Sequence, residues 1–443
     1  MHTKWIIRTW ILPAAALVIF TSLASAQAVL TLDAAVANAV AQHPSMRGAQ
    51  AAEREASART DHARSALLPR VDLTETWQRG NQPVFVFGSL LAQRRFGEED
   101  FAIRALNHPD ALANYRTAVT VEQLVFDGRR TGSALDTARL GEQHAVLGTR
   151  ELASSLRAAA TQAYGSVLMA EAERKAALSA VQSATEDVAR VERRRNAGMA
   201  TEADVLALQV HLARMRAREI AAASREAVAR VTLNEVMGEP IDATFVLVLP
   251  ATDVADLPPI DQLEAEARKN RPDLLMAGVR VEMAEAAVTA SKAGYFPQAS
   301  LMGGYEWNGG TFADRSPAWN LGAYVRWNLF SGAADRARLR EARAAVERAG
   351  AGRDALDARL RVELRAARAR VEDARAREGV GRSASTQAAE SQRITRERYE
   401  AGLASLTDLL RAADAVLDAD SLHTAALVDL VISAAQLDRA RGR

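Results

Sequence analysis

The sequence predicts a mainly helical protein with a small β part, built from two copies of one long unit. Aromatic residues make up only 5% of the 443 residues, and alanine, arginine, glutamate and leucine are heavily used, as in long packed helices. The segment RRNAGMATEADVL at 194–206 returns as RYEAGLASLTDLL at 398–410. Two pairs of segments with alternating apolar and polar residues interrupt the helical pattern. Together these observations predict an internal tandem repeat.

The repeated segment has the features of a tight turn between two helices. A glycine in each copy suits the left-handed position that ends a helix. A hydroxyl residue three positions later can cap the next helix, and an aspartate three positions further completes a capping box. The copies align Gly198 with Gly402, Thr201 with Ser405, and Asp204 with Asp408. Each copy therefore turns one long helix back on another.

The first 26 residues read as a secretory signal. Lys4 and Arg8 precede an apolar stretch at 11–23 and a small-residue cleavage site at 24–26. A retained anchor helix is the alternative, but the apolar run is short for a membrane span. The remaining sequence has no stretch of transmembrane-helix length and no cysteine, so thiolate metal sites and disulfides are excluded. The net charge of +1 favours no nucleic-acid partner.

The first half reads as helix, strand, loop, strand, very long helix, turn and helix. Pro69 ends the helical pattern just before the first strand. The long helix would extend about 100 Å at 1.5 Å per residue. We expect helices at 31–42, 45–67, 129–195 and 201–236, strands at 71–77 and 118–126, a loop at 80–116 with a short helix near 90–95, and a linker at 242–259.

The second half repeats this order. An offset of 228 aligns Pro69 with Pro297, whereas an offset of 204 aligns Phe126 with Phe330. The first half therefore carries 24 additional residues, all between its two strands. We expect strands at 299–307 and 320–330 and helices at 333–399 and 405–437. The glycines at 350 and 352 lie inside a helix, where they indicate a kink or a close helix contact rather than a phosphate loop.

One chain does not complete this architecture. Long helices with alanine at core positions bury little area and need neighbours on more than one side. Four strands of about 7–11 residues leave exposed edges, and this length matches a tilted transmembrane strand. Aromatic residues gather at the strands, as in the girdles of membrane barrels: Trp77, Tyr305, Trp307, Trp319, Tyr324 and Trp327. We expect a membrane barrel shared between chains, with a soluble sheet capping the helices as the alternative.

The sequence resembles the TolC-like outer-membrane efflux proteins over essentially its whole mature length. The resemblance rests on the repeat, on LPRV and FPQA entering strands, on LVFDG and NLFSG leaving them, and on two AG-x5-D-[VL]-L hairpins. It implies a homotrimer with a 12-stranded transmembrane β-barrel, four strands per chain, and a long α-helical barrel, or tunnel, in the periplasm. It also implies a passive exit duct of a tripartite efflux or type I secretion system, working with a periplasmic adaptor (membrane fusion) protein and an inner-membrane transporter.

The resemblance divides the chain into segments. They are a signal peptide (1–26), N-terminal equatorial and tunnel helices (27–70), a first β-hairpin with a long external loop (71–127), a first tunnel hairpin (128–240), an equatorial linker (241–259), second equatorial and tunnel helices (260–298), a second β-hairpin (299–331), and a second tunnel hairpin with the C-terminal helix (332–443). Pro69 and Pro297 mark the helix-to-strand junctions.

The resemblance also implies a gate at the periplasmic tip. Asp204 and Asp408 match acidic residues of the aperture, with helix capping alone as the alternative role. Tyr399 matches an aromatic residue that holds the inner hairpin shut. The family's arginine two residues after the second glycine is Ala404 here, and a further family aspartate is Arg411. The latch must therefore differ, and we expect Arg398 or Arg411 to supply its cation.

No residue pattern indicates catalysis. The histidines are scattered without an i,i+4 pair, and no nucleophile–base constellation or catalytic carboxylate pair is present, so we expect no enzyme, metal or cofactor. The run of three arginines at 193–195 is typical of a solvated helix face, with pairing to a partner helix as the alternative. A periplasmic coiled-coil structural or adaptor protein is the competing function, although such a protein needs no aromatic-girdled strands.

Overall fold

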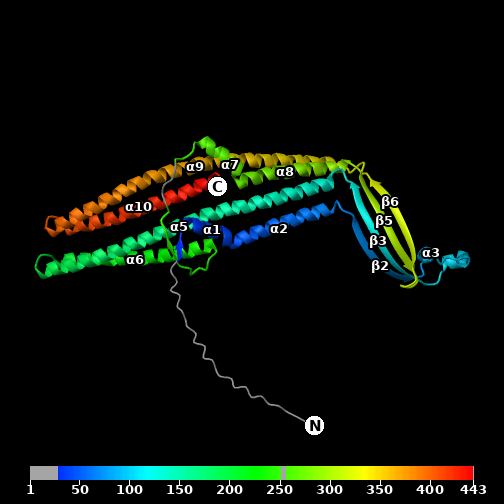
Figure 1. Cartoon of the computed structure of the whole chain (residues 1–443), viewed down its shortest axis with the longest axis horizontal. Helices are drawn as coiled ribbons and strands as arrows, with labels where there is room; N and C mark the ends of the chain where they lie inside the picture. The colour runs from blue at the N-terminus through cyan, green and yellow to red at the C-terminus, as the bar shows by residue number, and fades with distance from the viewer. Residues whose placement is uncertain (1–27, 251–255, 443) are drawn as a thin grey trace, which may run out of the picture.

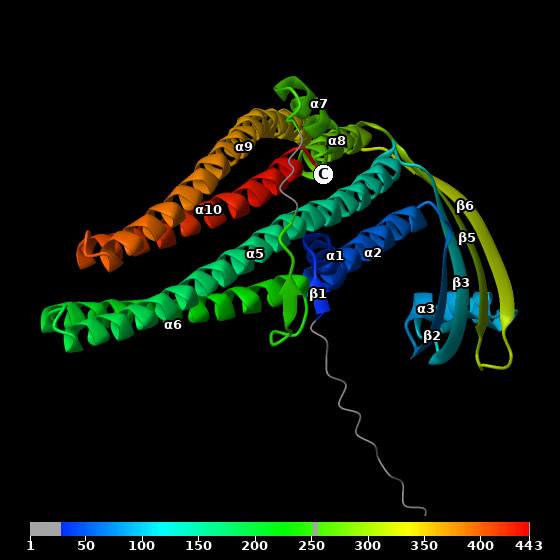
Figure 2. The same cartoon turned by 60° about the vertical axis from the view of Figure 1, so that its left-hand side comes forward.

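The computed structural model describes residues 28–250 and 256–442, so the expected signal sequence lies outside the described residues. The molecule is elongated, with a four-stranded sheet at one end and the turns of two helical hairpins at the other (Figure 1). The two hairpins are separate pairs that lie side by side, with their turns at the same end (Figures 1 and 2). None of the helices in the described ranges combines the length and apolarity of a membrane span.

The two halves contain the same order of main elements. The first comprises α1 (Leu32–Gln42), α2 (Pro44–Ser65), β2 (Arg70–Gly80), β3 (Leu112–Phe126), α5 (Arg130–Asn196) and α6 (Glu202–Met237). The second comprises α7 (Ile260–Asn270), α8 (Pro272–Lys292), the short η2 (Ala293–Tyr295), β5 (Gln298–Gly309), β6 (Ser316–Arg326), α9 (Ala334–Glu400) and α10 (Leu406–Ala440). The first half also has α3 (Pro83–Ala92), η1 (Glu98–Phe101) and α4 (Ile103–Asn107) between its strands.

The helices form a curved layer in which α5 is central. At successive levels along its length, α5 packs against α2 and α6 on one side and against α8 and α10 on the other. Helix α9 in turn packs against α8 and α10. Close approach depends on glycine: a Cβ at Gly381 of α9 would lie 2.9 Å from the Cα of His423 on α10. The layer therefore runs from α2 and α6 through α5, then α8 and α10, to α9.

The sheet has the same order. Its strands run β2–β3–β5–β6, all antiparallel, so the β3–β5 pairing joins the two halves. Strands β2 and β6 are the outer strands and lack a second partner in the described chain. Pro69 and Pro297 directly precede β2 and β5, positions where a missing backbone N–H removes no ladder hydrogen bond. The order of the strands across the sheet therefore matches the order of the helices across the layer.

A small parallel pair lies midway along the molecule. The strands β1 (Ala28–Leu30) and β4 (Phe245–Leu247) pair beside α5. The hydroxyl of Tyr164 lies 2.8 Å from the Leu30 carbonyl oxygen and 2.7 Å from the Val248 carbonyl oxygen, and its single hydrogen is donated to one or shared between them. Tyr164 is fully buried. The linker expected at 242–259 therefore contains a strand in its described part.

Other expected bounds were wrong, as was one of the two alternatives for the glycines at 350 and 352; strand β3, for example, begins at Leu112 and not at 118. The helix expected near 90–95 begins at Pro83, because Pro83 occupies the first helical turn, where a missing N–H costs nothing. The last strand ends at Arg326, and residues 327–330 lie outside the ladder. A Cβ at Gly350 or Gly352 would meet nothing within 4 Å, so neither glycine makes a close helix contact within the described chain.

Candidate functional site

The two hairpin turns have matching geometry. Gly198 has φ 74° and Gly402 has φ 76°, the left-handed conformation that glycine adopts without strain. In the first turn, Asp204 Oδ2 accepts from the Thr201 backbone N–H at 2.9 Å, and the Asp204 N–H donates to Thr201 Oγ1 at 3.2 Å. Ser405 makes the same two bonds with its aspartate, at 3.1 and 3.2 Å. Both expected capping boxes are present.

The turn aspartates are held in their charged form. The backbone N–H of Thr201 lowers the pKa of Asp204, and the hydroxyl of Ser405 lowers the pKa of Asp408. The positive charges of Arg411 and Arg398 lower the pKa of Asp408 further. Within this chain, these two arginines therefore stabilise the charged form of the aspartate in the second turn.

A cation does contact Tyr399, and it comes from the other hairpin. The guanidinium carbon of Arg194 lies 5.1 Å from the centre of the Tyr399 ring, and its Nη1 donates to the Tyr399 carbonyl at 3.3 Å. Both side chains are half-buried. Burial raises the pKa of the Tyr399 hydroxyl, so the ring stays neutral. Sequence reasoning missed Arg194, although the alternative interpretation of the arginine run, pairing with another helix, pointed to it.

Further contacts join the hairpins beside this pair. Arg190 of α5 forms an ion pair with Glu400 at the end of α9. Val191, Val205 and Leu208 form a buried apolar cluster, and partly buried Leu406 and Leu410 of the second hairpin pack against it. The tips of the two hairpins are therefore held together by one apolar cluster and by arginines of α5.

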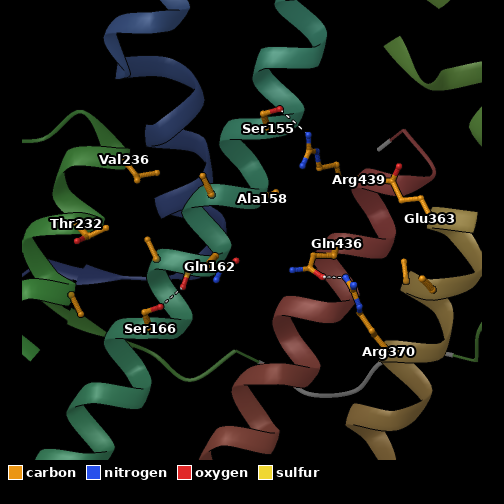
Figure 3. A pocket seen from close by; sticks show the side chains of 15 residues that line it. Ser155, Ala158, Gln162, Ser166, Thr232, Val236, Glu363, Arg370, Gln436 and Arg439 are labelled. Atoms are coloured by element: carbon orange, nitrogen blue, oxygen red, sulfur yellow. Dashed lines mark hydrogen bonds between the residues drawn. The ribbon is translucent and has the colours of Figure 1, made fainter. Parts of the chain in front are cut away.

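Higher up, the hairpins meet across a groove. A cavity of about 810 Å³ lies between α5 and α6 on one side and α9 and α10 on the other (Figure 3). Alanine and serine line α5 here, and the contact across the groove is polar: Arg439 Nη2 donates to Ser155 Oγ at 3.2 Å. Arg439 also pairs with Glu151 of α5 at 3.4 Å, so polar contacts join the hairpins at this level.

The sheet has one polar and one apolar face. Side chains alternate along each strand, and the register aligns the alternation across all four strands. One face carries Asp72, Thr74, Thr76, Arg116, Thr120, Glu122, Glu306, Asn308 and Asn320. The other carries Val71, Leu73, Trp77, Val121, Leu301, Tyr305, Trp319, Leu321 and Val325, all of them exposed in the single chain. Glu75 also lies on this face, where it pairs with Arg315 at 3.0 Å. An exposed apolar face of this size requires a lipid or protein environment.

Comparison with known proteins agrees with this geometry. The model of the outer membrane efflux protein family matches residues 35–239 and 263–443. The chain belongs to this family. Outer membrane efflux proteins are channels of the outer membrane that extend into the periplasm, and the family transports rather than catalyses. Its members form trimers and work with periplasmic adaptors and inner-membrane transporters.

Relatives and solved structures support the same family. The chain is 30% identical to Protein CyaE of Bordetella pertussis over 74% of this chain and 69% of that protein. It is 26% identical to the pyoverdine export outer membrane protein OpmQ of Pseudomonas aeruginosa, over 68% of this chain and 61% of OpmQ. The fold matches a membrane protein from Pseudomonas aeruginosa with a TM-score of 0.80, at 22% identity and 93% coverage of both chains. It matches the CmeC outer membrane channel of Campylobacter jejuni with a TM-score of 0.79, at 16% identity, covering 93% of this chain and 85% of CmeC.

Proposed function

We propose that three copies of this outer membrane efflux protein form one continuous duct, a 12-stranded barrel in the outer membrane joined to a tunnel of helices in the periplasm. In this assembly 71–127 and 299–331 supply the barrel, and 128–240 and 332–443 supply the tunnel. The duct is the exit of a tripartite efflux or type I secretion system. An inner-membrane transporter supplies the energy through a periplasmic adaptor.

The observation that carries the proposal is the two-faced sheet with its two outer strands. In lipid every backbone polar group needs a partner within the protein, so strands β2 and β6 must each find a further strand. Four strands are too few to curl into a closed barrel, and the smallest membrane barrels have eight. Pairing β2 of one copy with β6 of the next satisfies every edge, places the apolar face in lipid and lines the lumen with the polar face.

The helical tip is the gate in this proposal. Closure brings three copies of Asp204 and of Asp408 around one axis, where charged carboxylates favour cations over anions. The contact between Arg194 and Tyr399 joins the two hairpins of each copy and holds the aperture closed. The turns at Gly198 and Gly402 are the surface that meets the periplasmic adaptor. Opening is then a shift of one hairpin against the other.

The test uses the full-length protein extracted from outer membranes. We expect an SDS-resistant, heat-sensitive oligomer with the mass of three chains, and cation-selective conductance in planar bilayers. Replacing Asp204 and Asp408 together by asparagine should reduce the cation preference and leave the oligomer unchanged. A lone subunit recovered without detergent, or a trimer that stays without conductance after Arg194→Ala, would refute the proposal. Co-purification after cross-linking in cells tests the adaptor and the transporter.

A further inference from the structure

The residues between β2 and β3 form a folded unit on the polar face of the sheet. This unit, residues 81–111, is called the insert and contains α3, η1 and α4. Gln93, just after α3, donates from Nε2 to the Ala113 carbonyl at 2.9 Å and to Asn114 Oδ1 at 3.0 Å. Asn114 Nδ2 donates in turn to Asn308 Oδ1 at 2.9 Å. Asn114 and Asn308 belong to the polar face, and all three side chains are buried, so the insert covers the end of this face next to it.

The insert also spans the width of the sheet. It leaves from β2 at one edge and reaches β6 at the other, where Ser316 Oγ donates to the Gln93 carbonyl at 2.9 Å. Arg94 Nη2 donates to the Pro317 carbonyl at 3.1 Å. Arg94 has φ 58°, a left-handed conformation rare for a residue with a side chain, and this bond helps to hold it. The insert lies at the end of the sheet that is farthest from the helices (Figure 1).

The insert has an apolar surface that the chain itself leaves uncovered. Its interior is ordered by edge-to-face contacts of Phe96 with Phe87 and Phe101, with ring centres 4.9 and 5.0 Å apart. Val84 remains 79% exposed, Phe101 66% and Ile103 78%. These three residues are called the apolar tip of the insert. Large apolar side chains left this exposed on a folded unit favour a protein contact.

The insert also carries a hollow that can receive such residues. A cavity of about 530 Å³ is lined mainly by apolar residues of 83–112, together with Asp100, Ala102, Arg104, His108 and Asp110. Phe101 and Ile103 alternate in sequence with these lining residues. One insert therefore offers both projecting side chains and a receiving surface, which is what a head-to-tail ring of identical copies requires.

We propose that the inserts of three copies contact one another through their apolar tips and close the barrel mouth opposite the helical gate. This inference rests on the proposed trimer. When the sheet closes, its polar face becomes the interior, so three inserts fixed to that face converge on the axis. Each apolar tip therefore packs against the insert of a neighbouring copy.

Cross-linking tests the contact directly, because the chain contains no cysteine. Ile103→Cys in the full-length protein in outer membranes should give a cross-linked dimer with a short bis-maleimide, since two of three converging thiols can be joined. Thr120→Cys is the matched control: its side chain is exposed on the same face, away from the insert, and faces its copies across the open lumen. This control should give no dimer.

Accessibility tests the closure. A polymer-linked maleimide added outside intact cells should label Thr120→Cys slowly, whereas a small maleimide should label it readily. Introducing Ile103→Asp into the Thr120→Cys variant places three carboxylates together at the mouth. Labelling of Thr120→Cys by the polymer-linked maleimide should then be about tenfold faster. Ile103→Leu, which keeps the apolar contact, should leave the rate unchanged.

The outcomes separate this inference from the proposed function. A parent protein that runs as a trimer, but whose Ile103→Cys variant gives no dimer and whose Ile103→Asp variant keeps the parent labelling rate, overturns the insert contact alone. A parent protein that is not a trimer overturns the proposed duct and the insert contact together. A dimer of the Ile103→Cys variant, with accelerated labelling of the Ile103→Asp variant, supports both.

Discussion

Replacing Arg194 by alanine should open the helical tip. Arg194 is the cation that contacts Tyr399, through its ring at 5.1 Å and its carbonyl at 3.3 Å, and so joins α5 to the end of α9. The substitution removes both contacts. It leaves the capping boxes intact, because their hydrogen bonds run between each turn's own hydroxyl residue and aspartate.

The size of the effect follows from these contacts. A cation–π contact at a partly exposed site contributes about 0.5–1 kcal/mol. The long hydrogen bond, half-buried, adds about 0.5 kcal/mol, the low end of the usual range. Each copy therefore loses about 1–1.5 kcal/mol, and three copies that open together lose about 3–4.5 kcal/mol. Since about 1.4 kcal/mol corresponds to a factor of ten, the ratio of open to closed channels should rise at least about a hundredfold.

Single-channel recording in planar bilayers measures this ratio. The matched control is Arg193→Ala, which removes the same charge one position earlier, from an exposed side chain. Tyr399→Phe keeps the ring and the backbone carbonyl, so it should stay closed, whereas Tyr399→Ala should open. Equal open probability in the Arg194→Ala and Arg193→Ala channels would show that charge alone, and not the contact with Tyr399, controls the tip.

Three further outcomes are expected from thermal unfolding in detergent. Tyr164→Phe should cost about 0.5–1.5 kcal/mol, because the buried hydrogen bond between the hydroxyl and the Leu30 carbonyl, at 2.8 Å, is lost. Gly381→Ala should destabilise by about 1–3 kcal/mol, since its Cβ would lie 2.9 Å from the backbone of α10. Gly379→Ala should instead stabilise the protein by about 0.5–1 kcal/mol, because a Cβ at this position would meet nothing within 4 Å. A Gly381→Ala variant more stable than the Gly379→Ala variant would contradict the packing described. The lowered pKa values of Asp204 and Asp408 mean that their stabilisation is complete above the unfolded-state pKa of about 3.9 and is lost as the pH falls through the folded-state value. Melting temperature should therefore fall less steeply below about pH 4 in the double asparagine variant than in the parent.

Features encoded by neighbouring residues could be predicted from the sequence. The turns at Gly198 and Gly402 and their capping boxes need only residues within one turn of each other. The two long helices followed from periodicity, and their bounds agree with the structure to within a residue or two. The position of the insert followed from the change in repeat offset, because a repeat fixes where additional residues must lie.

Features that depend on tertiary contacts could not be predicted. Arg194 and Tyr399 are 205 residues apart, and only the packing of two hairpins shows which arginine of the run reaches the ring. Strand β4 has three residues and forms only because β1 and Tyr164 supply its partners. The apolar sequence of α3 fits a strand as well as a helix, and its helical form depends on packing against the end of the sheet.

The order of the elements indicates how one contact between copies completes both layers. Strand β2 lies on the same side of the molecule as α2 and α6, and strand β6 lies on the same side as α9. The sheet and the helical layer therefore end on the same two sides. The outermost helices still expose apolar residues, including Ile220 on α6 and Val362 on α9. The two sides differ, so they can only pair head to tail, and a head-to-tail contact that closes gives a ring. Because a single rotation must then pair β2 with β6 and α6 with α9 at once, an aspartate at Ile220 or at Val362 should weaken the trimer even though neither residue lies in the membrane barrel.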